Sequence, residues 1–177
     1  MARRSTGYSL YELLVTTSVV AMLVAIGVPS FEAMLARQRQ LVEINALFHA
    51  IHLARKESIM RRKVVSICPS RDGLQCLDAT DWTAGWLMFE NKDRDSPPHV
   101  DANEPVLRRH DVSGSVVIRA NRRAFTLRST FLRATNGTIV VCDRAGRIPP
   151  KGLVINYTGR PRVALATLRG QPYTCAD

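Results

Sequence analysis

Basic side chains are concentrated near the C-terminal end of the sequence, where their spacing suits the binding of phosphate groups. The segment Gly159-Arg160-Pro161-Arg162 sets a proline, whose ring fixes φ, between two arginines and after a glycine that permits a turn. If the segment is extended, alternate side chains point the same way and each guanidinium group can grip a phosphate. The pattern predicts a polyanion-binding surface, and its alternative is a solvated basic turn. Six basic residues fall within 26 positions here with no acid among them: Arg144, Arg147, Lys151, Arg160, Arg162 and Arg169.

The charge of the chain is divided unevenly along its length. The 177 residues carry a net charge of +10. Residues 1–118 hold 14 basic and 13 acidic side chains, whereas residues 119–177 hold 11 basic and two acidic ones, a net charge of +9. A surface of one sign attracts polyanions or anionic membranes. The length of the chain suits one domain rather than two.

Residues that could serve catalysis or bind a metal are not arranged in a pattern typical of either. The sequence has no nucleophile motif and no glycine-rich phosphate loop. His49 and His52 are three positions apart, but no further ligand pattern accompanies them. Asn91, Asp93 and Asp95 are spaced as in a calcium loop, but serine replaces the glycine that such loops need at their sixth position. We therefore expect no enzyme, no cofactor and no metal, and we interpret residues 91–104 as a polar surface loop.

An apolar segment near the N-terminus predicts a membrane helix. Sixteen residues without a charge, 13–28, follow Arg3 and Arg4, and extension to residues 8 and 31 gives a bilayer-spanning length if Glu12 is tolerated. The basic flank keeps the N-terminus in the cytoplasm. We first interpret Glu12, a carboxylate at the edge of this helix, as a functional residue whose partner is a cation of a neighbouring subunit. The alternative is a carboxylate that lies at the level of the lipid headgroups. Gly7 precedes the apolar core, so the core stays on the mature protein, unlike a secretory signal.

The run Gly7-Tyr8-Ser9-Leu10-Tyr11-Glu12 resembles the type IV prepilin motif. The resemblance implies that a prepilin peptidase cuts after Gly7, that the new terminus at Tyr8 is N-methylated, and that this amine pairs with Glu12 of a neighbouring subunit. Pro29 matches the proline that kinks the helix in that family. Tyr8 departs from the usual phenylalanine but keeps a bulky aromatic ring.

The periodicity of the sequence changes after Lys63 from a helical to a strand pattern. Before it, apolar residues recur mostly at three- and four-residue spacings: Phe31, Leu35, Leu41, Phe48, Ile51 and Ile59. They predict a helix that ends around Arg62, with its first half in the membrane and its second half packed on a globular head. After it, six short runs with turn signals between them predict antiparallel strands at 64–68, 85–90, 116–119, 138–142, 153–157 and 162–166. The pattern predicts an α+β fold: a long kinked N-terminal helix packed on an antiparallel β-rich globular head.

The four cysteines predict disulfides, since the head is exported and their number is even. Three pairings of Cys68, Cys76, Cys142 and Cys175 are possible. We favour Cys68–Cys76, which closes a short loop, and Cys142–Cys175, which ties the C-terminal tail to a strand. Zinc binding is the alternative, but no C-x-x-C spacing supports it.

The head resembles the GspH/FimT group of minor pilins and pseudopilins. The residues that carry this likeness are Cys68-Pro69-Ser70, Asp72-Gly73, Cys76, Trp82, Gly85-Trp86 and Phe89. It implies the type IV pilin fold, with a cleaved leader (1–7), a long helix whose first part is transmembrane (8–62) and a β-rich head with a basic tail (63–177). It also implies single-pass insertion in the inner membrane and later assembly with other pilin subunits into a periplasmic or extracellular filament. On physical grounds we expect Trp82, Trp86 and Phe89 to fill the core against the helix rather than to bind a ligand.

The Gly-Arg-x-Arg segment, 159–162, resembles the motif by which FimT-like minor pilins bind DNA in natural transformation. The implied partner is double-stranded DNA, held through its phosphates with little sequence preference and steep salt dependence. Only Tyr157 and Tyr173 interleave with the basic residues, so stacking on single strands has less support. The rival interpretation is a structural or priming subunit of a type IV pilus, or a type II secretion pseudopilin, whose basic surface meets an acidic neighbour.

Overall fold

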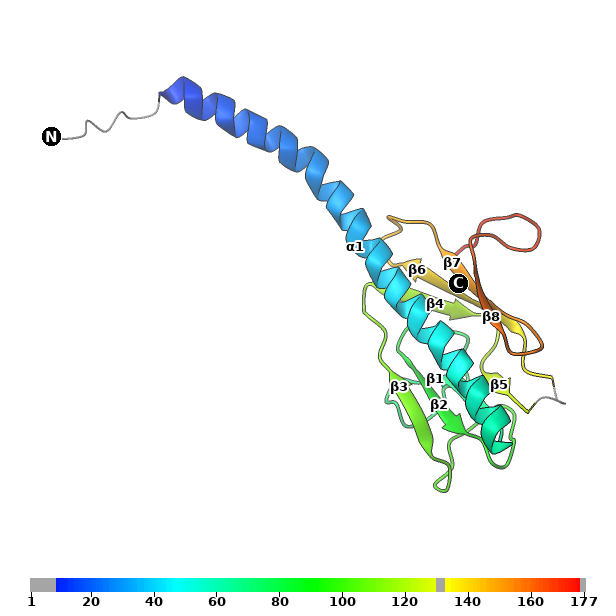
Figure 1. The fold of residues 1–177 in the computed structure, drawn as a ribbon. Coiled ribbons are helices and arrows are strands. Elements are labelled where there is room, and N and C mark those ends of the chain that lie inside the picture. Colours follow the sequence, from blue (N-terminus) through cyan, green and yellow to red (C-terminus); the bar gives the residue numbers. More distant parts are fainter. Residues whose placement is uncertain (1–8, 130–132, 176–177) are drawn as a thin grey trace. The chain divides into compact units, whose positions relative to one another are not determined.

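The computed structural model describes residues 9–129 and 133–175 and divides into two compact units, Met1–Leu35 and Ala36–Asp177. Within these described ranges, one helix, α1 (Leu10–Arg61), is followed by eight strands in two antiparallel sheets (Figure 1). A long N-terminal helix followed by antiparallel sheets confirms the predicted α+β class.

The first unit consists, in its described part, of the start of α1. Ser9 and Glu12 form a capping box that the sequence analysis did not identify: the Ser9 N–H donates to Glu12 Oε2 (3.0 Å), and the Glu12 N–H donates to Ser9 Oγ (3.2 Å). The helix continues through Pro29. Among the described residues, α1 is long and apolar enough to cross a membrane. Its most apolar stretch has a mean hydropathy of 2.1.

The second unit holds both sheets. Their hydrogen-bonded orders are β3-β2-β1-β5 and β4-β6-β7-β8. The strands of the first sheet are β1 (Val65–Pro69), β2 (Trp86–Glu90), β3 (Val106–His110) and β5 (Phe125–Leu127). Those of the second sheet are β4 (Val116–Ala120), β6 (Gly137–Asp143), β7 (Lys151–Ile155) and β8 (Pro161–Ala164).

The core of the second unit joins α1 to both sheets. Trp82 and Trp86 are fully buried in it, as predicted. Phe89 is also buried, but it belongs to a smaller cluster with Cys68 and Leu87 rather than to the core against the helix. The helix contributes Ile44, Leu47, Ala50, Ile51 and Ala54 to the main cluster.

The apolar residues that marked the helical period differ in burial. Ile51 is buried and Phe48 packs partly buried against the core, whereas Leu41 and Ile59 are each 37% exposed. Much of the buried face consists of small residues, with alanines at 36, 50 and 54. The large apolar residues alone therefore do not define the face that packs on the sheets.

Two buried polar side chains of α1 bind the sheets. Gln40 Nε2 donates to the carbonyl oxygens of Val141 (2.9 Å) and Pro149 (3.0 Å). Glu43 is 3% exposed; its Oε2 lies 2.7 Å from His110 Nε2, and its Oε1 accepts the Ser113 N–H at 3.1 Å. Because buried polar groups need partners, these contacts fix which face of α1 meets the strands.

Strand positions differ from the predicted ones in three places. β3 and β5 were not predicted: β3 is a partly exposed edge strand with two arginines, and β5 has only three residues. β7 ends at Ile155, so Tyr157 lies in a turn rather than in a strand. β7 therefore covers 151–155 instead of the predicted 153–157, because Asn156 hydrogen-bonds the backbone that follows it and forms the turn.

The cysteines are paired as the sequence analysis favoured. Disulfides join Cys68 to Cys76 and Cys142 to Cys175. The second bridge, together with a contact of Tyr173 against Gly152, holds the C-terminal tail on the second sheet: a Cβ atom at Gly152 would lie 2.4 Å from Tyr173 Cζ. The tail itself turns back between Ala166 and Pro172.

Candidate nucleic-acid interface

The turn between β7 and β8 carries the predicted Gly-Arg-x-Arg segment and is organised by Asn156. Asn156 Oδ1 accepts hydrogen bonds from the Thr158 N–H (3.0 Å), the Thr158 hydroxyl (2.7 Å) and the Arg160 N–H (2.9 Å). The Gly159 N–H donates to the Asn156 carbonyl oxygen at 2.9 Å. An asparagine that bonds the backbone ahead of it is typical of tight turns, and this one sets the position from which Arg160 leaves the backbone.

Gly159 is required by both conformation and space. Its φ is +71°, in the left-handed region that favours glycine. A Cβ atom there would lie 2.9 Å from Leu127 Cδ2, 3.3 Å from Arg55 Nη1 and 3.4 Å from Ala134 Cβ. The turn therefore packs directly on α1, on β5 and on the segment before β6.

Four arginines from three parts of the chain gather around this turn, and we call them the turn cluster: Arg55, Arg133, Arg160 and Arg162. Arg160 and Arg162 are exposed, and neither guanidinium group makes a hydrogen bond or ion pair within residues 9–129 and 133–175. Arg55 reaches the turn at Gly159, and Arg133 lies over the Tyr157 ring, with its Cζ 6.0 Å from the ring centroid. Arg55 and Arg133 were not predicted for this surface, because no local sequence signal marks a contact that only the fold creates.

The other basic residues predicted for this surface lie elsewhere on the second sheet. In the register of the sheet, Gly137 pairs with Ile155 at the end that carries the turn, while Val141 pairs with Lys151 toward the other end. These two positions are four residue steps apart along the strand, about 13 Å. Arg144, Arg147 and Lys151 therefore lie toward the end opposite the turn, and Arg169 lies in the tail beyond β8. The six basic residues between positions 144 and 169 are close in sequence but do not lie together at one site.

Arg147 is engaged by an acid that directly precedes the predicted basic run. Its Nε donates to Asp143 Oδ2 (2.9 Å), its Nη2 to Asp143 Oδ1 (2.7 Å) and its backbone N–H to Asp143 Oδ2 (3.0 Å). The hydrogen bonds from the Arg147 guanidinium hold the pKa of Asp143 below its ordinary value, against the opposing effect of burial. Arg144 is exposed and donates from Nε to the Gly114 carbonyl oxygen at 2.8 Å.

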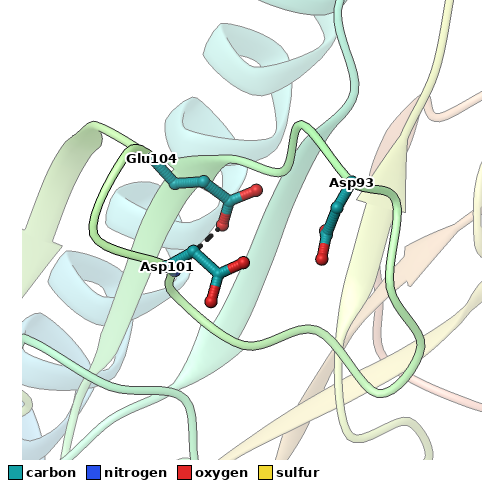
Figure 2. Close-up of side chains that lie close together, drawn as sticks. All are labelled: Asp93, Asp101 and Glu104. Carbon is teal, nitrogen blue, oxygen red and sulfur yellow. Dashed lines mark hydrogen bonds between the residues drawn. The ribbon is translucent and has the colours of Figure 1, made fainter.

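Three carboxylates outside the turn cluster lie close together in the loop after β2. Figure 2 shows Asp93, Asp101 and Glu104 around one space, and one oxygen of each lies within 4.8 Å of the others. Glu104 is 6% exposed and accepts the backbone N–H groups of Lys92 and Asp101. Its carboxylate therefore organises the loop. The set differs from the predicted spacing, since Asp95 instead binds Asn91 and His99.

The residues of the predicted processing site, Gly7 and Tyr8, lie outside the described residues. Glu12 is exposed and engaged in the capping box with Ser9. His49 and His52 are exposed on α1, and both rings contact Phe48 edge-on.

Comparison with known proteins places this fold. Residues 43–159 match the family described as type II transport protein GspH. The type IV minor pilin FimU of Pseudomonas aeruginosa PAO1 superposes with a TM-score of 0.50 and 20% identity, over 78% of this chain and 94% of FimU. The minor pseudopilin EpsH from the type 2 secretion system of Vibrio cholerae superposes with a TM-score of 0.51 and 8% identity, over 71% of this chain and 96% of EpsH. No curated protein matches the sequence. The chain belongs to the GspH family, and its fold is that of the type IV minor pilins and pseudopilins.

Proposed function

We propose that the chain is a minor pilin that binds extracellular DNA through the turn cluster, for uptake in natural transformation. The observation that carries this proposal is the gathering of Arg55, Arg133, Arg160 and Arg162 around one rigid turn, with the last two exposed and unpaired among the described residues. A guanidinium group without a protein partner is free to donate to phosphate oxygens. The turn is fixed by Asn156 and Gly159, so little ordering is needed on binding.

The expected mode of binding is to the phosphate backbone. Phosphate contacts carry no base sequence directly, so the interface tolerates any duplex. They also release counterions, which makes affinity fall steeply with salt. Arg144, Lys151 and Arg169 extend the positive field beyond the turn cluster and assist the approach of DNA.

The test is fluorescence anisotropy with labelled duplex DNA and the full chain in non-ionic detergent micelles, titrated over salt. Arg160→Gln/Arg162→Gln should lower affinity by about 100-fold or more, because two charge-assisted contacts are lost. Both side chains are exposed, so the fold should be retained, which circular dichroism can verify.

The matched control removes the same charge from another face. Arg71 and Arg108 are also exposed and make no hydrogen bond or ion pair with any other described residue. Arg71→Gln/Arg108→Gln should change affinity less than threefold. Equal losses in the two double variants would refute a localised site, and absence of binding by the unaltered chain at low salt would refute the function.

The second candidate function is structural, and family membership favours it. In this case the chain primes a type IV pilus or serves as a pseudopilin of type II secretion, and the basic surface meets an acidic subunit. The exposed apolar residues of α1 would then pack on neighbouring helices. Loss of filaments or secretion on deletion, restored by the Arg160→Gln/Arg162→Gln chain, would assign this role independently of DNA binding.

Both functions share one route of assembly. We propose cleavage by prepilin peptidase between Gly7 and Tyr8, anchoring in the inner membrane by the apolar part of α1 with the N-terminus in the cytoplasm, and then transfer to a filament. Glu12 would exchange its capping contact with Ser9 for the N-terminal amine of a neighbouring subunit.

A further inference from the structure

Tyr157 is an exposed aromatic ring at the centre of the turn cluster. It is 62% exposed, whereas Trp82, Trp86, Phe89 and Phe125 of the same unit are at most 1% exposed. It stands in the turn after β7, three residues before Arg160. Tyrosine is intermediate between the buried and the exposed residue types, and this one is exposed in the turn that carries Arg160 and Arg162.

The position of Tyr157 is fixed from three sides. Its carbonyl oxygen accepts the Ala134 N–H at 2.9 Å. Asn156, which directly precedes it, accepts hydrogen bonds from the backbone N–H groups of Thr158 and Arg160, which follow it. The Arg133 guanidinium lies over the ring, 6.0 Å from its centroid, near the limit of a cation–π contact. The ring is thus presented by the fold rather than left mobile.

Tyr173 does not share this property. Its ring packs on the backbone at Gly152, where a Cβ atom would come within 2.8 Å of three atoms of its phenol group. Tyr173 therefore holds the tail on the second sheet. The two tyrosines that interleave with the basic residues have different roles.

From this geometry we propose that Tyr157 is a stacking site for an unpaired nucleobase, so that the turn cluster binds single-stranded stretches and frayed ends of DNA in addition to duplex. The inference rests on the proposed function and adds a ligand class to it. Cations beside an aromatic platform are the combination that holds single strands, since the phosphates meet the cations while a base stacks on the ring. Bases inside a duplex are already stacked and paired, so they cannot occupy the ring.

The experiment compares the full chain with its Tyr157→Ala, Tyr157→Phe and Tyr157→Leu variants in non-ionic detergent micelles. The probes are labelled oligothymidylate and a blunt duplex of equal length. Tyr157→Ala and Tyr157→Leu should weaken binding of the single strand by about 5- to 150-fold and binding of the duplex by less than twofold. Tyr157→Phe keeps the ring and should bind both probes as the unaltered chain does.

The outcomes separate the inference from the function on which it rests. Unchanged single-strand affinity in Tyr157→Ala, or equal losses on both probes, would overturn the stacking site while DNA binding stands. A Tyr157→Leu chain that binds like the unaltered one would show that apolar bulk suffices, which also overturns stacking. Failure of the unaltered chain to bind either probe would overturn both proposals. Arg160→Gln should weaken the binding of both probes by the same factor, so that the ratio of the two affinities is unchanged.

Discussion

At the scale of single residues, the ion pair of Asp143 and Arg147 is expected to make stability depend on pH. The Asp143 side chain is 2% exposed and receives three hydrogen bonds from Arg147. Its pKa is lower in the folded chain than the ordinary value near 3.9. A lowered folded pKa stabilises the fold above the unfolded pKa, and this contribution is lost as pH falls through the folded pKa.

Asp143→Asn should therefore destabilise the protein at pH 7, by about 1–3 kcal/mol, and the difference should shrink as pH is lowered from about 5 toward 2. Thermal unfolding of both chains, followed by circular dichroism across this range, measures the effect. Asp78→Asn is the matched control, because the Asp78–Arg123 pair is exposed on both sides (52% and 62%) and such pairs contribute about 0–1 kcal/mol. A gap between Asp143→Asn and the unaltered chain that stays constant with pH would contradict this role.

At the scale of elements, the Cys142–Cys175 bridge ties the segment that follows β8 to β6. In chain-entropy terms a loop of this length stabilises by about 3–4 kcal/mol. β8 is an edge strand, paired on one side only by β7, so release of the tail should loosen it together with Arg162. Cys142→Ser/Cys175→Ser should lower the unfolding free energy by about that amount and weaken duplex binding although it alters no contact residue.

The control for this element is the other bridge. Cys68 and Cys76 lie on the first sheet and its loop, so Cys68→Ser/Cys76→Ser should destabilise by about 2.5 kcal/mol and leave DNA affinity unchanged. Both variants are compared in urea unfolding and in the anisotropy assay. Unchanged DNA affinity in a folded Cys142→Ser/Cys175→Ser chain would show that the tail does not support the turn.

Elements with a strong local signal could be predicted from the sequence, and elements defined by their neighbours could not. The long apolar segment, the short β-type run at 138–142 and the even cysteine number predicted α1, β6 and the disulfides. β5 exists because three residues pair with β1, and the buried face of α1 is set by Gln40, Glu43 and alanines whose partners lie on the strands. The Gly-Arg-x-Arg segment was visible in sequence, whereas its companions Arg55 and Arg133 needed the fold.

At the scale of the whole molecule, the structure changes the meaning of the uneven charge. By sequence, the excess of +9 belongs to residues 119–177, and residues 1–118 are nearly balanced at +1. In the folded chain Arg55, from the balanced part, lies against Gly159 in the basic part. The proposed DNA-binding surface should therefore cross this division and include the end of α1.

Neighbouring positions of α1 provide the test of this arrangement. Arg55 and Lys56 carry the same charge, but only Arg55 reaches the turn, and Lys56 is exposed one position further around the helix. If DNA contacts the turn cluster, Arg55→Gln should reduce the magnitude of the slope of log affinity against log salt by about 0.9, the effect of one phosphate contact, whereas Lys56→Gln should leave the slope unchanged. If total charge alone governs binding, the two variants should weaken it equally. Because both changes remove one charge from neighbouring positions of the same helix, total charge cannot account for a difference in slope between them.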